Sequence, residues 1–301
     1  MNIFGVYRDK GQIKYKLFGI TLFRRGKKTG FYDMHHILGM ITGQACNPAT
    51  LNMQHGWIPG SEVFPFDLNN RSMREMLIWN KRLHEDWLSK SDIPCHIVGA
   101  PFVHYRRHMG IKPNPDAKGT IVFPSHSTKK IKVIYDIDRY CEQLLALPEQ
   151  FHPFSICLHP HDIREYQMDK EYEKRGFKTL CAGLDPNRPF YEVFYENLKA
   201  HRYASSNDPG SYLFYAVEMG IPFFLLGTPG AVTDPQDSQD GSAYVINNLP
   251  YAQQAVKLFT DSNKDQITKE QRDFVYSELG LNDCISTEEL AEILKRHPAS
   301  P

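Results

Sequence analysis

The chain has 301 residues, with 41% apolar and 23% charged side chains, and its 35 Lys and Arg are balanced by 35 Asp and Glu. This length and composition favour a two-domain α/β protein with sizeable cores. The zero net charge gives no electrostatic reason to expect nucleic acid as the main partner. No run approaches the roughly 18 consecutive apolar residues of a membrane span, and the mixed, charged start is not a signal peptide. We therefore expect a cytoplasmic protein.

The cysteines and histidines argue against a metal or redox centre. The six cysteines are scattered without a Cys-x-x-Cys pair, so neither a zinc site nor a redox motif is encoded locally, and a reducing cytoplasm fits best. The thirteen histidines include no HExxH motif. We expect neither a metal ion nor another cofactor.

Four basic side chains cluster near the N-terminus. Arg24, Arg25, Lys27 and Lys28 follow directly on the apolar run at residues 17–23. One interpretation is a solvated loop. The alternative is a weak peripheral contact with the anionic surface of the inner membrane.

The first part of the chain has the β-loop-α-β order that is typical of a parallel sheet. In chain order we expect a strand at 37–42, a strand end at 51–54, a loop at 55–60, a helix at 72–90 and a strand at 95–99. Two prolines in the polar stretch 112–116 disfavour helix and mark a linker. We therefore expect one domain over residues 1–115 and a second over 116–301.

The second part repeats the same order more clearly, and its C-terminal helices are expected to belong to the second domain. The expected strands are 119–124, 154–158, 177–181, 203–205 and 221–226. The expected helices are 137–147, 165–175, 190–201, 211–219, 251–258, 269–279 and 288–295. Ser286 and Glu289 have the spacing of a capping box at the start of the last helix.

Three polar clusters follow strands of the second part. They are Ser125-His126-Ser127-Thr128, His159-Pro160-His161-Asp162 and the segment from Ser205 to Ser211. Ligands of an open parallel α/β sheet bind beyond the carboxyl ends of its strands. The expected topology therefore brings these clusters to one rim.

The third cluster suits a phosphate. Asn207 or Asp208 can cap the following helix, and Gly210 removes side-chain bulk beside it. Free backbone N–H groups there, with the Ser206 and Ser211 hydroxyls, would form an anion site. An ordinary capped helix start is the alternative, because the same residue types are common in turns.

Histidines supply the candidate catalytic groups. His159 directly follows an apolar strand and precedes Pro160, so it either contacts a phosphate oxygen or ties down its loop. His126 has the same two interpretations. In the first part, His55 lies within Gln54-His55-Gly56-Trp57 and is the leading candidate for a general base, against a structural loop histidine. Asp33, His35 and His36 form a weaker cluster there.

These motifs resemble bacterial glycosyltransferases of the GT-B architecture that build capsules and lipopolysaccharide. The matching segments are Gln54–Trp57, Val98–Phe102, Phe123–Ser127, Leu158–Pro160, Ser205–Asn207 and Gly210–Ala216. The resemblance implies an α/β fold of two Rossmann-like domains facing each other across a cleft. It also implies a nucleotide-sugar donor and a glycan or glycolipid acceptor at the bacterial surface.

Within that class, an HP motif followed by a serine motif is similar to the sialyl- and Kdo-type transferases, which use CMP-activated sugars. By this match, His159, Pro160, Ser205 and Ser206 contact the cytidine monophosphate. The catalytic acid that those families carry in their first domain has no certain counterpart here. The His55-Gly56 element is instead similar to glycerophosphate-type polymerases, in which a histidine is the proposed base.

The expected site therefore has a donor side and an acceptor side, with His55 and His159 as catalytic groups. The donor side comprises Ser125, His126, Ser127, Thr128, His159, Pro160, Ser205, Ser206, Asn207, Gly210 and Ser211. The acceptor side comprises Gln54, Gly56, Trp57, Asp33 and His36. No Asp-x-Asp triplet occurs in the rim loops, and a helix N-terminus can stabilise a leaving phosphate without metal.

Two other functions remain open. One is a transferase that moves glycerophosphate or polyol phosphate from a CDP-linked donor. The other is a non-catalytic sugar- or nucleotide-binding scaffold.

Overall fold

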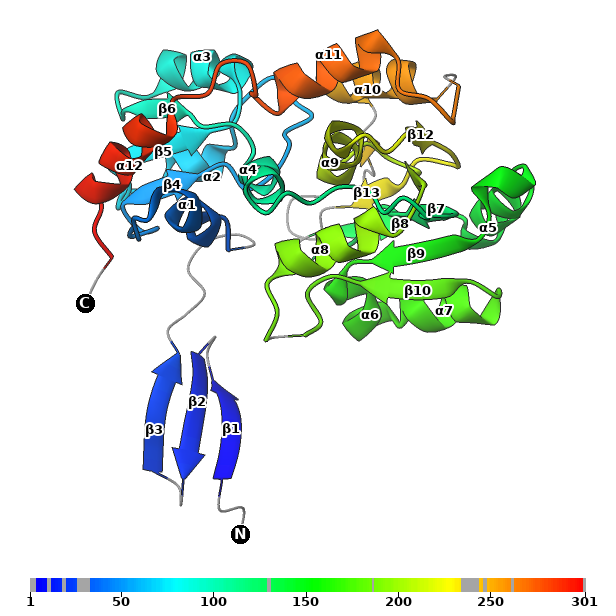
Figure 1. Ribbon diagram of the computed structural model, residues 1–301, viewed down its shortest axis with the longest axis horizontal. Helices are drawn as coiled ribbons and strands as arrows, with labels where there is room; N and C mark the ends of the chain where they lie inside the picture. Colours follow the sequence, from blue (N-terminus) through cyan, green and yellow to red (C-terminus); the bar gives the residue numbers. More distant parts are fainter. Residues whose placement is uncertain are drawn as a thin grey trace.

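The computed structural model describes residues 4–9, 12–17, 20–25, 33–128, 131–185, 187–233, 244–245, 248–260 and 263–299. Its α/β fold contains two parallel sheets, shown with their helices in Figure 1. None of the helices in these ranges is both long and apolar enough to cross a bilayer.

The chain begins with an antiparallel sheet of three strands in the order β1-β2-β3. The strands are β1 (Phe4–Asp9), β2 (Gln12–Leu17) and β3 (Ile20–Arg25). Arg24 and Arg25 therefore belong to a strand, and the solvated-loop interpretation is wrong for both. Lys27 and Lys28 lie outside the described residues.

The first parallel sheet has the order β4-β5-β6. Its strands are β4 (Leu51–Met53), β5 (Glu75–Ile78) and β6 (Cys95–Ile97), and its helices are α1 (Met34–Thr42), α2 (Pro65–Leu68), α3 (Lys81–Lys90) and α4 (Pro101–His108). The strand expected at 37–42 is wrong, because this apolar run forms α1. Ile37 and Leu38 are buried on that helix, which ends at Gly43 with a left-handed φ of 71°.

The helix expected at 72–90 is also wrong in its first half. Residues 75–78 form β5, which is nearly completely buried. A buried strand is a continuous apolar run, and periodicity alone cannot distinguish such a run from a buried helix. The helix begins only after Asn80, whose side chain accepts a hydrogen bond from the backbone N–H of Leu83.

The second parallel sheet has five strands in the order β10-β9-β7-β11-β12. They are β7 (Thr120–Val122), β9 (Phe154–Leu158), β10 (Lys178–Cys181), β11 (Tyr203–Ser206) and β12 (Phe223–Leu225). All five lie within the expected strands or within one residue of them. The chain builds outward from β7 to β10, then crosses back to add β11 and β12. The order therefore reverses between β7 and β11, where open α/β sheets hold their ligands.

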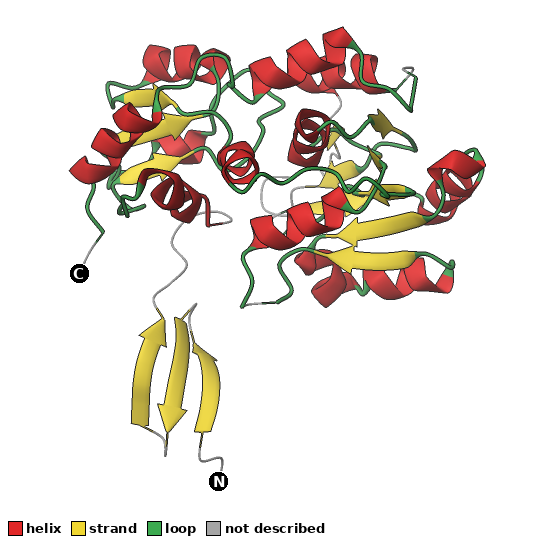
Figure 2. Cartoon of the chain, in the orientation of Figure 1, coloured by secondary structure: helices red, strands yellow, loops and turns green. Residues whose placement is uncertain are grey.

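Helices cover both faces of this sheet, as Figure 2 shows. They are α5 (Ile137–Leu145), α6 (Pro160–Tyr166), α7 (Met168–Lys174), α8 (Phe190–Lys199) and α9 (Ser211–Met219), with a 3-10 turn η2 (Glu149–Phe151) before β9. Ile121 and Phe123 point to the core with α8 and α9, whereas Val122 points to the core with α5 and α7. The helix expected at 165–175 is divided at Gln167, which has a φ of 51°.

A small sheet in the order β14-β13-β8 was not expected. It contains β8 (Lys132–Ile134), β13 (Ala231–Thr233) and β14 (Tyr244–Val245). Because β8 immediately follows the 125–128 cluster, this sheet lies beside the rim of the five-stranded sheet.

Three helices complete the chain: α10 (Pro250–Phe259), α11 (Lys269–Glu278) and α12 (Thr287–Arg296). The capping box of Ser286 and Glu289 is confirmed. Arg296 donates to Glu75 of β5 at 2.7 Å, and α12 packs against α1. By these contacts α12 lies with the first parallel sheet, whereas we expected every C-terminal helix to lie with the second part. The boundary at residue 115 stays a prediction.

Candidate functional site

A cavity of about 740 Å³ lies at the carboxyl ends of the second parallel sheet. One side is formed by residues that follow β7, β9 and β11, including His126, His159 and Gly210. The other side is formed by the 55–59 loop and by single residues of α1 and α4. The cavity is therefore lined both by the strand ends where the order of one sheet reverses and by the loop that follows β4 of the other sheet.

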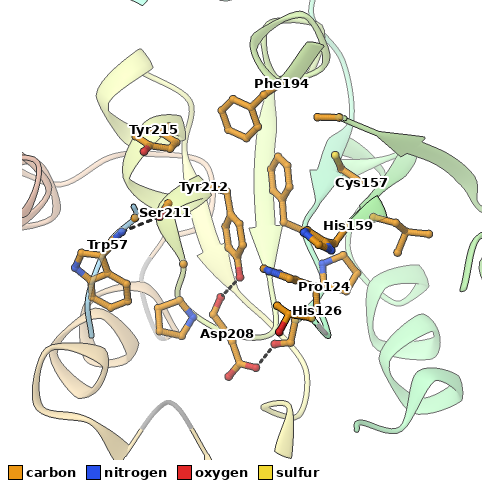
Figure 3. Close-up of a pocket in the computed structure, with 18 of the residues that line it drawn as sticks. Trp57, Pro124, His126, Cys157, His159, Phe194, Asp208, Ser211, Tyr212 and Tyr215 are labelled. Atoms are coloured by element: carbon orange, nitrogen blue, oxygen red, sulfur yellow. Dashed lines mark hydrogen bonds between the residues drawn. The ribbon is translucent and has the colours of Figure 1, made fainter. Parts of the chain in front are cut away.

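Two histidines stack on the side of this cavity that is formed by residues following β7 and β9. The ring centroids of His126 and His159 are 4.5 Å apart and their planes meet at 18°. Figure 3 shows the two side chains next to each other. Burial lowers the pKa of His126 to about 4. Burial and the neighbouring His126 ring lower the pKa of His159 to about 3. Both rings are therefore neutral at pH 7, which permits their close stacking.

The tautomer of His159 follows from its place at the start of α6. Its Nδ1 atom accepts a hydrogen bond of 3.2 Å from the backbone N–H of His161. A neutral imidazole that accepts at Nδ1 carries its proton on Nε2. His159 can therefore donate one hydrogen bond from Nε2. Pro160 suits the first turn that follows, because its missing N–H would have no partner within the helix.

The loop after β7 is held in place by buried acidic and amide side chains. The Ser125 hydroxyl donates to the Asp208 carboxylate, and the Ser125 N–H donates to Asn207 Oδ1 at 2.8 Å. Asp208 also accepts from the N–H of Gly230 at 2.7 Å. The expected capping of α9 by Asn207 or Asp208 is therefore wrong, because both side chains bind other loops across the sheet end.

Ser127 and Thr128 shape the same loop. The Ser127 N–H donates to Asp162 at 3.1 Å, and its hydroxyl accepts from the N–H of Val133 at 3.1 Å. Ser127 is buried and does not line the cavity, whereas Thr128 does. Asp162 belongs to the cluster expected at the rim, but its contact with Ser127 was not expected.

Helix α9 begins at the cavity. Gly210 occupies the N-cap position, makes no side-chain cap and lines the cavity together with Ser211. A Cβ at Gly210 would lie 2.7 Å from the Tyr212 ring, so only glycine fits this approach. The first backbone N–H groups of a helix lack partners within it and carry partial positive charge. This end of α9 can therefore receive an anion.

The serines of β11 lie beneath this surface. Ser205 and Ser206 are fully buried, Asn207 is nearly so, and none of the three lines the cavity. Ser206 accepts from the N–H of Asp208 and lies 3.0 Å from the Tyr212 hydroxyl, which itself donates to the Asp208 carbonyl. Ser206 thus holds the turn into α9, whereas Asn207 binds Ser125 and the carbonyl of Thr228 in neighbouring loops. Their direct contact with a nucleotide stays a prediction.

The 54–60 loop forms the opposite side. His55 lines the cavity, its ring centroid lies 5.2 Å from that of Phe64, and burial lowers its pKa. The backbone N–H of Trp57 donates to the Ser211 hydroxyl at 3.0 Å, which joins this loop to the start of α9 (Figure 3). Gly56 lies so close that a Cβ there would be 3.3 Å from the same hydroxyl.

Three acceptor-side candidates lie away from the cavity lining. Gln54 is buried, donates to the Gly56 carbonyl and accepts from the Trp79 N–H, so it braces the loop. Asp33 precedes α1, and His36 on α1 lies 2.9 Å from the Tyr191 hydroxyl. Neither Asp33 nor His36 lines the cavity.

Sequence reasoning missed two features of the cavity wall. Asp208 lines it as a buried carboxylate, although the sequence suggested only a cap. The rings of Phe123 and Tyr212 stack with centroids 5.0 Å apart. The sequence position was the signal in each case, since Phe123 follows β7 while Asp208 and Tyr212 follow β11 at the expected rim.

No group of three or more His, Cys, Asp or Glu that could hold a metal ion occurs among the described residues.

Comparisons with known proteins assign no family. No protein-family model and no curated protein matches the chain. Among solved structures, it is similar to the wall teichoic acid polymerase TagF with CDPG, at 14% identity and a TM-score of 0.37, over 77% of this chain and 59% of that one. It is also similar to the GtfA/B complex, at 11% identity and a TM-score of 0.33, over 98% of this chain and 65% of that one. The chain thus spans less than two thirds of either protein, and neither similarity assigns an activity to it.

Proposed function

We propose that this protein is a glycosyltransferase of the GT-B type. It moves a sugar from a nucleotide-activated donor, with a CMP-sugar favoured, to a bacterial surface polysaccharide or lipopolysaccharide. The observation that carries the proposal is the cavity at the β7–β11 reversal, which has two stacked neutral histidines on one side and His55 on the other.

The donor side suits a leaving phosphate. His159 donates from Nε2, and the N-terminus of α9 at Gly210 adds backbone N–H groups and the positive end of the helix dipole. Donors fixed in advance stabilise charge that develops on a leaving phosphate without having to reorganise. Transfer without a metal ion is therefore part of the proposal. The motif order from Gln54 to Ala216 supports the same assignment.

The acceptor side suits a general base. Burial lowers the pKa of His55, so its ring is neutral and able to accept a proton at pH 7. The acceptor hydroxyl enters between His55 and the donor. Since the acceptor glycan is proposed to be membrane-linked, a peripheral contact through Arg24, Arg25, Lys27 and Lys28 belongs to the proposal as well.

Donor turnover with product mass spectrometry tests this function. Purified protein is incubated with CMP-sialic acid and CMP-Kdo, without added metal and with chelator present. We expect release of CMP from at least one donor, by hydrolysis or by transfer to a lipopolysaccharide or capsule acceptor. Absence of CMP release from both donors, together with absence of nucleotide binding, would contradict the proposal.

A second function is favoured by one specific feature, the His55-Gly56 element that faces the cavity. A histidine base of this kind suits a transferase that moves glycerophosphate or polyol phosphate from a CDP-linked donor. The two reactions differ in the product mass, because only this one leaves phosphate in the product. A non-catalytic scaffold instead predicts that His55→Ala and His159→Ala leave every donor intact, as the unmodified protein would.

A further inference from the structure

The loop that carries His55 is tied down along its whole length. Gln54 donates to the Gly56 carbonyl at 2.7 Å, and the N–H of Tyr251 donates to the Pro59 carbonyl at 3.1 Å. Arg82 donates to the carbonyls of Ile58 at 3.1 Å and Gly60 at 2.8 Å. The position of the loop that carries His55 is therefore set in part by groups that lie outside the cavity.

These ties meet at one buried carboxylate. Glu278 Oε2 accepts from Trp57 Nε1 at 2.7 Å and from Arg82 Nη2 at 2.5 Å. Its side chain is 5% exposed, and that of Arg82 is 14% exposed. The Arg82 guanidinium also lies 3.6 Å from the centroid of the Tyr251 ring. Glu278 thus holds the indole of the loop directly and the loop carbonyls through Arg82.

The place of Glu278 in its helix argues for a specific role. It is the last residue of α11, and a negative charge at the C-terminal end of a helix is unfavourable because that end carries partial negative charge. Burying a carboxylate is also unfavourable unless donors compensate it, and an apolar side chain often serves packing as well or better. Both donors that compensate Glu278 come from the Trp57–Arg82 arrangement around the His55 loop. The buried carboxylate is therefore compensated by the same side chains that hold the His55 loop.

We propose that Glu278 is the residue that positions His55 for the reaction. It does so by holding the Trp57 indole and the Arg82 guanidinium. It does not line the cavity, so it touches neither donor nor acceptor. Trp57 does line the cavity and packs on Phe214, with ring centroids 4.6 Å apart, and His55 lies two residues before it. Helix α11 thereby controls the geometry of a loop more than 200 residues earlier in the chain.

The kinetic test rests on the proposed function and uses Glu278→Gln in the full chain. Glutamine keeps an acceptor oxygen for Trp57 but removes the charge that holds Arg82. Misplacing a catalytic group by about 1 Å can cost about 100-fold in rate, so we expect kcat for donor turnover to fall by about 10- to 100-fold. The Kd for CMP, measured by calorimetry, should stay within about twofold, because the donor side is unchanged.

Asp273→Asn is the matched control. Asp273 lies on the same helix and pairs at the surface with Lys269 at 2.5 Å, so its loss should leave kcat and Kd unchanged. An unchanged kcat in folded Glu278→Gln would overturn the proposal, and so would an equal loss of CMP affinity and kcat. Arg82→Lys is the second variant should Glu278→Gln fail to fold. Lysine keeps the positive charge but lacks the guanidinium group that donates to both loop carbonyls. This variant should also lower kcat while leaving the Kd for CMP nearly unchanged.

Deuterium exchange decides the structural half without any substrate. Amides of residues 54–60 should exchange faster in Glu278→Ala and in Trp57→Phe. The double variant should hardly exceed Glu278→Ala, because both substitutions remove the Trp57–Glu278 hydrogen bond. Additive effects of the two substitutions on the exchange rates, or unchanged exchange rates, would contradict the role of Glu278 in holding the loop. If the unmodified protein neither binds nor turns over nucleotides, the proposed function fails while this measurement still tests the hold of Glu278 on the loop.

Discussion

The imidazole of His126 lies nearly flat on that of His159, with centroids 4.5 Å apart and planes at 18°. Each ring follows a different strand, β7 or β9, and these strands are neighbours in the sheet. Two cationic rings could not stack so closely at low cost, so the arrangement requires at least one neutral ring. Burial supplies that condition, since it lowers the pKa of both histidines well below the ordinary value of 6.5.

Stability should therefore fall in mild acid. Below about pH 6.5 the unfolded chain takes up protons on His126 and His159, whereas the folded chain stays neutral there until about pH 4. Each such histidine contributes at most about 1.4 kcal/mol of lost stability per pH unit in this window. Urea unfolding between pH 7.5 and 4.5 measures the slope. His159→Gln should flatten it and exposed His108→Gln should not; equal slopes in all three proteins would refute the assignment.

Ligand binding should take up protons. A phosphate beside the histidine pair favours the charged imidazolium, so it raises the pKa of both rings towards the working pH. At pH 6 the enthalpy of CMP binding should then vary with the ionisation enthalpy of the buffer, in the sense of net proton uptake. Calorimetry in three buffers of different ionisation enthalpy, none of them phosphate, measures this. A buffer-independent enthalpy would show that both rings stay neutral when CMP is bound.

His55→Ala should separate chemistry from binding. Loss of a general base typically costs about 10²- to 10⁴-fold in rate, and we expect donor transfer to the acceptor to fall by that range. The affinity for CMP should hardly change, because His55 belongs to the 54–60 loop and not to the strand ends that carry the His126–His159 pair. His108→Ala is the control, since His108 is exposed at the end of α4. Full transfer activity in His55→Ala would assign the base to another residue.

Gly280→Ala should destabilise the contact between α11 and β5. Gly280 has a φ of 68°, and a Cβ there would lie 1.6 Å from the Trp79 carbonyl oxygen. Gly176 has a similar φ of 83° but no atom within 4 Å of such a Cβ. Gly176→Ala should therefore cost only about 1 to 2 kcal/mol of left-handed strain, and Gly280→Ala at least about 2 kcal/mol more. Chemical denaturation measures both, and equal losses would contradict the close approach.

The second parallel sheet was predictable because each of its strands is a short apolar run that ends in a polar loop. The run at 37–42 is also short and apolar yet forms α1, which packs against α4 and α12 with Ile37 and Leu38 buried. Tertiary packing decides its conformation. The 72–90 segment joins a buried strand to an amphipathic helix, and local spacing cannot separate them. Asn80, a good N-cap residue in the middle of the segment, was the signal that marks the boundary.

The rim of the site was predictable, but the partners of its side chains were not. Asn207 and Asp208 are common caps, and nothing in the local sequence shows that Ser125 and Gly230 compete for them. Likewise, the link from Trp57 to Glu278 joins residues that are 221 positions apart. Such pairs are set by the tertiary fold, and the local sequence around one partner does not indicate the other.

Nucleotide binding at the His126–His159 pair is the central claim, and calorimetric titration tests it most directly. CMP, CDP, UDP and GDP are titrated into the unmodified protein and into His159→Ala. We predict binding of cytidine nucleotides at one site per chain, weakened at least about tenfold in His159→Ala, which corresponds to about 1.4 kcal/mol. Absence of binding by all four nucleotides, or equal affinity in the variant, would contradict the claim.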